Sequence, residues 1–167
     1  MSEQSHGVVY VATGTKAVQL FEISAAHLRE VEPTLSIVVF TDAAHEERIR
    51  NLKIKDCEVR IIEEPTFTFF DKPLALQRTP FDKTIYLDAD TIALRPFSDE
   101  IFEALDYVPI LALSDGIAFN LEWEYENYPP AIPQFNSGVI AYRFPDAQPV
   151  FENWARLAAG MHTKKRR

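Results

Sequence analysis

The first half of the chain alternates short apolar runs with stretches in which apolar residues recur every three or four positions. Short apolar runs rich in β-branched residues are typical of buried strands, and the longer periodicity is typical of helices packed on one side. Pro33 ends the first helical stretch, and Asp42 is placed to cap the second. The pattern predicts strands over 8–12, 35–40, 58–62 and 83–87, and helices between them over 18–31, 43–52 and 72–78.

Strands that alternate with helices in this order predict an α/β fold. Consecutive strand–helix–strand units place their strands parallel, joined by right-handed crossovers. We therefore expect a mostly parallel central sheet flanked by helices. The loop before the third helix carries Phe67, Phe69 and Phe70, which we expect to pack in the core or a lid rather than to offer a stacking surface.

The second half is less regular and contains seven of the eleven prolines. The expected elements are short: a helix over 100–105, strands over 108–113 and 138–142, and a final helix over 150–159. A long connection over 114–134 includes Trp123 and Tyr125. Connections of that length in a compact domain are usually functional or disordered.

The length of 167 residues indicates one domain over 8–160, between a flexible tail over 1–7 and a basic tail over 161–167. With 17 basic and 25 acidic residues the net charge is −8, which argues against a nucleic-acid partner. The single cysteine, Cys57, excludes an internal disulfide and a zinc site with several thiolates. No apolar run approaches the roughly 20 residues of a membrane span, and residues 1–7 are polar, which predicts a cytoplasmic protein.

Two carboxylates lie directly after the strand over 83–87. Side chains at positions i and i+2 of an extended chain point the same way, so Asp88 and Asp90 are expected to converge. Convergent carboxylates attract Mn²⁺ or Mg²⁺, whose other ligands are typically phosphate oxygens and water. Isolated Asp-x-Asp pairs are common by chance, but this pair lies where open α/β sheets bind ligands, at the carboxyl end of a strand.

The phrase Tyr86-Leu87-Asp88-Ala89-Asp90-Thr91 resembles the DxD core of GT-A glycosyltransferases. The resemblance is greatest to glycosyltransferase family 8, the glycogenin and bacterial galactosyltransferase group. The first strand leads into a Thr-containing turn, where that family binds the nucleotide, and Lys72 has the spacing of a family lysine that faces the sugar nucleotide. The segment 135–139, Phe-Asn-Ser-Gly-Val, resembles the family's Asn-Ser-Gly motif at the donor-sugar pocket.

The resemblance implies a GT-A fold, a Rossmann-like nucleotide-diphospho-sugar transferase architecture, over residues 8–144. A single helix lysine is often solvated, and Asn-Ser-Gly is a common turn sequence. Each therefore indicates a functional residue only in combination with the DxD phrase. The implied catalytic residues are Asp88, Asp90, Lys72 and Asn136, with Asp88 and Asp90 as metal ligands. The expected substrate-binding residues are Ala12, Thr13, Thr15, Lys72, Asp88, Ala89, Asp90, Asp115, Asn136, Ser137 and Gly138.

The chain departs from the family pattern after Gly138. The family carries an Asp-Gln motif and a late histidine that completes its metal site, whereas no Asp-Gln pair follows Gly138 here. His162 is the only late histidine, and it lacks the family's following glycine. We therefore expect a GT-A fold truncated at its C-terminus.

The predicted function is metal-assisted, retaining transfer of a sugar from a nucleotide-diphosphate sugar, with UDP as the expected nucleotide, to a carbohydrate or glycoconjugate acceptor. A second hypothesis, motivated by the missing second half, is a non-catalytic or truncated nucleotide-sugar-binding domain. A third is a nucleotidyltransferase, a class that usually has a Gly-rich basic loop after its first strand. The segment 13–16, Thr-Gly-Thr-Lys, has only one glycine and one basic residue and so resembles such a loop weakly.

Overall fold

A computed structural model describes residues 5–114 and 135–165, with side chains described as far as residue 159. The strands are β1 (His6–Ala12), β2 (Ser36–Thr41), β3 (Cys57–Ile61), β4 (Lys83–Asp88), β5 (Ile110–Ser114) and β6 (Phe135–Arg143). The helices are α1 (Thr15–Val31), α2 (Glu46–Asn51), α3 (Asp71–Leu76), α4 (Ser98–Ala104) and α5 (Gln148–Lys165). Asp115, Trp123, Tyr125 and the side chain of His162 lie outside the described residues.

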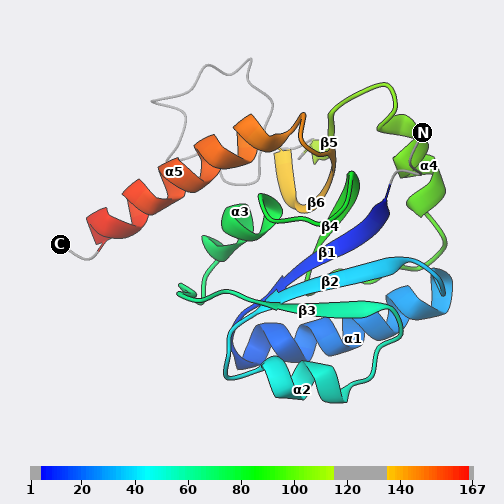
Figure 1. The fold of residues 1–167 in the computed structure, drawn as a ribbon, viewed down its shortest axis with the longest axis horizontal. Coiled ribbons are helices and arrows are strands. Elements are labelled where there is room, and N and C mark those ends of the chain that lie inside the picture. Colours follow the sequence, from blue (N-terminus) through cyan, green and yellow to red (C-terminus); the bar gives the residue numbers. More distant parts are fainter. Residues whose placement is uncertain (1–4, 115–134, 166–167) are drawn as a thin grey trace.

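The strands form one six-stranded sheet in the order β3-β2-β1-β4-β6-β5. Strands β1 to β4 are parallel to one another, while β6 is antiparallel to both β4 and β5. The predicted α/β class with a mostly parallel sheet is therefore confirmed. Figure 1 shows α1 and α2 on one side of this sheet and α3 and α5 on the other.

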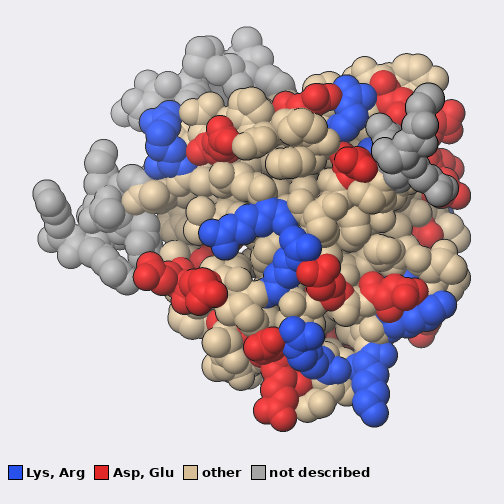
Figure 2. Space-filling view, viewed as in Figure 1, with Lys and Arg blue, Asp and Glu red and all other residues tan. Residues whose placement is uncertain are grey.

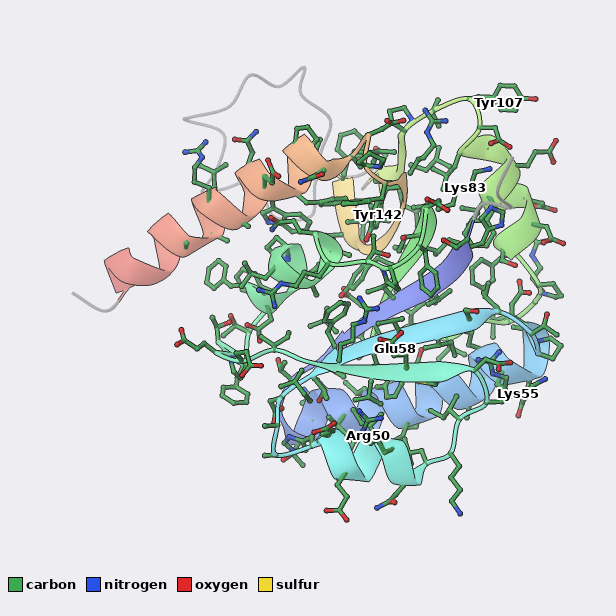
Figure 3. All side chains as sticks on the ribbon, in the orientation of Figure 1. Arg50, Lys55, Glu58, Lys83, Tyr107 and Tyr142 are labelled. Carbon is green, nitrogen blue, oxygen red and sulfur yellow. The ribbon has the colours of Figure 1, made fainter. Side chains whose placement is uncertain are left out.

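Each face of the sheet has its own hydrophobic core, because successive strand residues point to opposite faces. On one face Tyr10 and Ile85 pack with Phe21 of α1 and Phe102 of α4. The opposite core contains alternate residues of the same strands together with side chains from α3 and α5, namely Val9, Val38, Phe40, Tyr86, Ile140, Tyr142, Leu76 and Phe151. The Tyr142 hydroxyl, labelled in Figure 3, donates to the Leu76 carbonyl at 3.0 Å, which fixes α3 against β6.

The strand order reverses direction at β1, and this reversal places the candidate site. The chain runs outward from β1 to β2 and β3, and then returns to the other side of β1 as β4. The carboxyl ends of β1 and β4 are consequently neighbours, with Val11 paired to Asp88. Open α/β sheets bind ligands at such a switch point, because the outgoing connections diverge and leave a crevice.

Two details differ from the predictions. Helix α5 continues to Lys165, so most of the predicted basic tail over 161–167 is helical. Asp42 does not cap α2, which begins at Glu46, but accepts hydrogen bonds from the amides of Gly14 and Ala44. The side chain of Asp42 thus joins the end of β2 to the start of α1.

Two findings bear on the surface of the molecule. Among the described helices, none is long and apolar enough to cross a bilayer. On the face shown in Figure 2, basic and acidic side chains are intermixed, and neither charge forms a continuous patch there.

Candidate functional site

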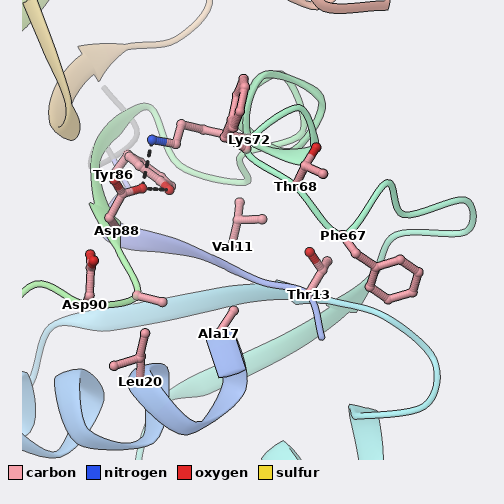
Figure 4. Close-up of a pocket in the computed structure, with 12 residues that line it drawn as sticks. Val11, Thr13, Ala17, Leu20, Phe67, Thr68, Lys72, Tyr86, Asp88 and Asp90 are labelled. Carbon is pink, nitrogen blue, oxygen red and sulfur yellow. Dashed lines mark hydrogen bonds and ion pairs between the residues drawn. The ribbon is translucent and has the colours of Figure 1, made fainter. Parts of the chain in front are cut away.

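A cavity of about 300 Å³ opens at the carboxyl edge of the sheet, between β1 and β4. Its lining comes from β1 and α1, the β3–α3 connection, α3, and the end of β4 (Figure 4). The lining residues are Val11, Thr13, Ala17, Leu20, Phe67, Thr68, Phe69, Lys72, Tyr86, Asp88, Ala89 and Asp90. The cavity therefore brings Thr13, Lys72 and the Asp88–Asp90 turn to one place, as the sequence predicted.

Asp88 is the centre of a charged cluster at one end of this cavity. The Lys72 ammonium lies 2.8 Å from Asp88 Oδ1, and the Tyr86 hydroxyl donates to the same oxygen. Lys72 Nζ also lies 4.9 Å above the Tyr86 ring. The side chain of Lys72 is only 7% exposed, so it is not a solvated helix lysine but a fixed positive charge at the sheet edge.

Tyr86 is a member of the cluster that sequence reasoning missed. Burial raises its pKa well above the usual value, and the negative charge of Asp88, the hydrogen bond to it and the charge of Asp90 act in the same direction. The hydroxyl therefore keeps its proton and remains a donor to Asp88. The sequence did contain a signal for this contact. Tyr86 lies two residues before Asp88 on the same strand, and side chains at positions i and i+2 of a strand point to the same face.

The Asn136–Gly138 segment reaches the cluster from β6. Lys72 Nζ donates to the Ser137 carbonyl at 2.9 Å and to Ser137 Oγ at 3.1 Å. The Gly138 amide donates to Asn136 Oδ1 at 2.7 Å, and a Cβ on Gly138 would lie 3.2 Å from Asp88 Oδ2. The antiparallel pairing of β6 with β4 thus delivers all three residues beside Asp88.

Whether a metal cation fits the site depends on the carboxylate oxygens that do not already accept hydrogen bonds from the protein. Asp90 lines the cavity, and among the described residues no donor hydrogen-bonds to its carboxylate or to Asp88 Oδ2. No group of three or more potential protein ligands gathers anywhere in the described part of the chain. Two carboxylates suit a hard divalent cation whose other ligands are phosphate oxygens and water.

The other end of the cavity is organised by Asp71, a second residue that sequence reasoning missed. Its buried carboxylate accepts from Thr13 Oγ1 at 2.7 Å and from the Phe67 amide at 3.0 Å. Phe67 has φ of 58°, a left-handed conformation that costs a bulky residue about 1–2 kcal/mol. Phe67 and Phe69 are mostly exposed, so they do not pack in the core, and the other half of the expectation, that they form a lid, stays a prediction.

Ala12 and Thr15 flank the cavity without lining it. Ala12 is fully buried at the end of β1, and Thr15 begins α1, where its hydroxyl lies 3.2 Å from His45 Nε2. His45 Nδ1 is in turn 2.8 Å from Asp42 Oδ1. Burial works to raise the pKa of Asp42, but hydrogen bonds from the Gly14 amide, His45 and the Ala44 amide outweigh it, and the pKa lies below its usual value.

The turn that carries Asp90 is held from beneath by α1. The Thr91 amide donates to the Asp88 carbonyl at 3.0 Å, which closes the turn. Ser24 Oγ of α1, which is buried, donates to the Thr91 carbonyl and lies 3.1 Å from the Tyr10 hydroxyl. A hydroxyl pair in the core therefore fixes the position of the Asp88–Thr91 turn.

An open, mostly parallel sheet with its cavity at the switch point defines a Rossmann-like class of fold. No protein-family model matches the sequence, and no curated protein matches it significantly. Solved glycosyltransferases nevertheless share the fold. Glycosyltransferase GlyE of Streptococcus pneumoniae TIGR4 is 17% identical with a TM-score of 0.64. Galactosyltransferase LgtC, solved with donor and acceptor sugar analogues, is 15% identical with a TM-score of 0.60.

The chain thus has the GT-A-like fold of these glycosyltransferases, while assignment to family 8 stays a prediction. The alignments cover 98% and 90% of this chain but only 40% of GlyE and 59% of LgtC, so it spans about half the length of these neighbours. A 4-diphosphocytidyl-2C-methyl-D-erythritol synthase from Anaerococcus prevotii DSM 20548 shares the fold as well, at 16% identity and a TM-score of 0.58, covering 90% of this chain and 76% of the synthase. The fold alone therefore does not distinguish a glycosyltransferase from an enzyme such as this synthase. A functional assignment has to rest on the residues of the site.

Proposed function

We propose that this chain binds a nucleotide-diphosphate sugar at the β1–β4 cavity and transfers the sugar to a carbohydrate or glycoconjugate acceptor. The observation that carries the proposal is the cluster of Lys72, Asp88 and Ser137, assembled from three separate elements at the switch point of the sheet. Binding of such a donor requires a positive charge for the diphosphate, carboxylates for a metal ion and polar groups for the sugar. The buried ammonium of Lys72, the carboxylates of Asp88 and Asp90, and the Asn136–Gly138 segment supply these groups.

Each residue has a distinct task in this proposal. Lys72 places a positive charge beside the diphosphate, whose negative charge grows as the bond to the sugar breaks. Asn136 and Ser137 offer an amide, a hydroxyl and backbone groups to the sugar hydroxyls, and Gly138 leaves room for Asp88. Thr13, at the end of β1, faces the nucleoside part of the ligand.

The free carboxylate oxygens of Asp88 and Asp90 would hold Mn²⁺ or Mg²⁺ together with phosphate oxygens. When bound, such a cation supplies charge neutralisation to the leaving diphosphate. UDP as the nucleotide and retention of configuration follow from the resemblance to family 8 and are part of the proposal. The cytoplasmic location remains a prediction from the sequence.

The test is Mn²⁺-dependent release of UDP from a panel of UDP-sugars, with and without simple sugar acceptors. The double variant Asp88→Asn plus Asp90→Asn keeps the shape of both side chains and should abolish turnover. Asp99→Asn, at an exposed position in the first turn of α4, is the matched control and should leave turnover unchanged. Equal turnover in the double variant and the control would remove both carboxylates from the proposed chemistry.

The non-catalytic alternative is favoured by one observation, the coverage of only 40% and 59% of the neighbouring enzymes. Calorimetry separates the two hypotheses. UDP binding that depends on Asp88 and Asp90, without sugar transfer to any acceptor, supports a binding domain. Transfer by the 167-residue chain supports the enzyme.

A further inference from the structure

The turn that precedes α3 holds an aromatic residue in a conformation that its side chain does not favour. Phe67 has φ of 58°, which glycine or asparagine adopts readily and a bulky side chain rarely does. Burial of the ring does not explain this conformation, because the residue is 59% exposed. Strain retained at an exposed aromatic side chain points to a role for the ring at the surface.

A buried carboxylate enforces this conformation. Asp71 has no solvent exposure, and its two oxygens accept four hydrogen bonds. Two come from Thr66, from its amide at 2.7 Å and its hydroxyl at 2.8 Å. The others come from the Phe67 amide at 3.0 Å and from Thr13 Oγ1 at 2.7 Å. Asp71 therefore ties the backbone of Phe67 directly to the end of β1.

The position of the ring gives the cavity two unlike ends. In Figure 4 the Phe67 ring lies beyond Thr13, at the opposite end from the ion pair of Lys72 and Asp88. A Cβ on Gly14 would lie 3.5 Å from the ring, so the turn after β1 passes directly beside it. A ligand that is flat and apolar at one end and anionic at the other matches this arrangement.

We propose that Phe67 is the stacking surface for the base of the nucleotide bound in this cavity, and that Asp71 is a positioning residue that holds Phe67 there. The inference rests on the proposed function, and it assigns the orientation of the ligand within the same site. Stacking on an aromatic ring is tolerant of base identity, because every base has a π-face. The contact therefore contributes affinity for a nucleotide without selecting which one.

Calorimetry with two probes tests the assignment, UDP and inorganic pyrophosphate, each with Mn²⁺. Phe67→Asn removes the ring and suits the left-handed backbone, so it isolates stacking from folding. We expect it to weaken UDP binding about tenfold and to leave pyrophosphate binding unchanged. Phe67→Trp should restore UDP binding. Tyr107→Ala, which removes an 82% exposed ring outside the cavity, is the control for loss of a surface aromatic side chain.

Asp71→Asn tests the positioning role. It replaces one carboxylate oxygen by a donor that faces other donors, so the turn loses its anchor. We expect the same selective loss of UDP binding, and we expect Phe67→Asn plus Asp71→Asn to lose little more than either alone. A lower thermal stability of Asp71→Asn with an unchanged ratio of UDP to pyrophosphate affinity would show a structural role only, and would overturn this part.

The outcomes separate this inference from the proposed function. UDP binding that is equal in wild type and Phe67→Asn overturns the inference and leaves the proposed function standing. Equal weakening of UDP and pyrophosphate in Phe67→Asn also overturns it, because the ring would then act on the whole site. If the wild type binds neither probe, the proposed function fails and the inference fails with it.

Discussion

Replacing Gly138 by alanine tests whether the close approach of β6 to Asp88 serves the site rather than the fold. A Cβ at this position would lie 2.9 Å from Asn136 Oδ1 and 3.2 Å from Asp88 Oδ2. The first distance is too short for a carbon and an oxygen, so the Asn136 side chain has to move, while the contact with Asp88 Oδ2 is only tight. Asp88 is restrained by Lys72 and Tyr86, and the Asn136 amide is the freer of the two.

The cost to stability follows from what is lost. Displacing the Asn136 side chain breaks its hydrogen bond with the Gly138 amide, worth about 1 kcal/mol. In a protein of this length that corresponds to about 3 °C in the midpoint of thermal unfolding. The effect on the ligand should be larger, because the methyl group occupies space beside Asp88, and we expect Mn²⁺-dependent UDP affinity to fall at least about tenfold.

Gly7→Ala is the matched control, because the same methyl group is added at the opposite end of the sheet. There a Cβ would lie 2.3 Å from the Phe81 ring, so the penalty is overpacking of about 1–3 kcal/mol. Circular dichroism against temperature and calorimetry with UDP and Mn²⁺ are to be run on both variants. The reasoning is refuted if Gly138→Ala loses several kcal/mol of stability while its folded fraction binds UDP normally.

Three further substitutions test individual contacts of the fold. Ser24→Ala removes the donor to the Thr91 carbonyl, so thermal unfolding should show that the free energy of unfolding falls by about 1–3 kcal/mol. Calorimetry should show weaker Mn²⁺ binding, because the Asp88–Thr91 turn loses this support. Lys83→Met leaves the Phe102 carbonyl at the end of α4 without its donor and should lower stability by a similar amount, with UDP affinity unchanged. The stabilising contribution of Asp42, measured against Asp42→Asn, should be complete above the ordinary pKa of 3.8 and should disappear as pH falls through its lower folded pKa. A difference between wild type and Asp42→Asn that stays constant down to pH 2 would contradict this assignment.

The element order and much of the site were predictable from local sequence. Apolar runs and helical periodicity depend on residues close together in the chain. Each predicted strand and helix is present within three residues of its expected bounds, except that α5 ends six residues later than predicted. Asp88 was named because it follows an apolar strand, and Lys72 because its spacing before Asp88 resembles a known family. The structure brings the two side chains to 2.8 Å. Asp71 escaped notice, because an aspartate beside a lysine looks like any exposed charged pair.

Local sequence accounts for the alternation of strands and helices and for the position of Asp88 directly after an apolar strand. Long-range packing selected which strands became neighbours, because strand pairing depends on burial and on crossovers between distant segments. The return of β4 to the side of β1, with β6 antiparallel beside it, brought Ser137 to Lys72. Burial of Asp71 against β1 then fixed Phe67 in a left-handed conformation that no local pattern favours.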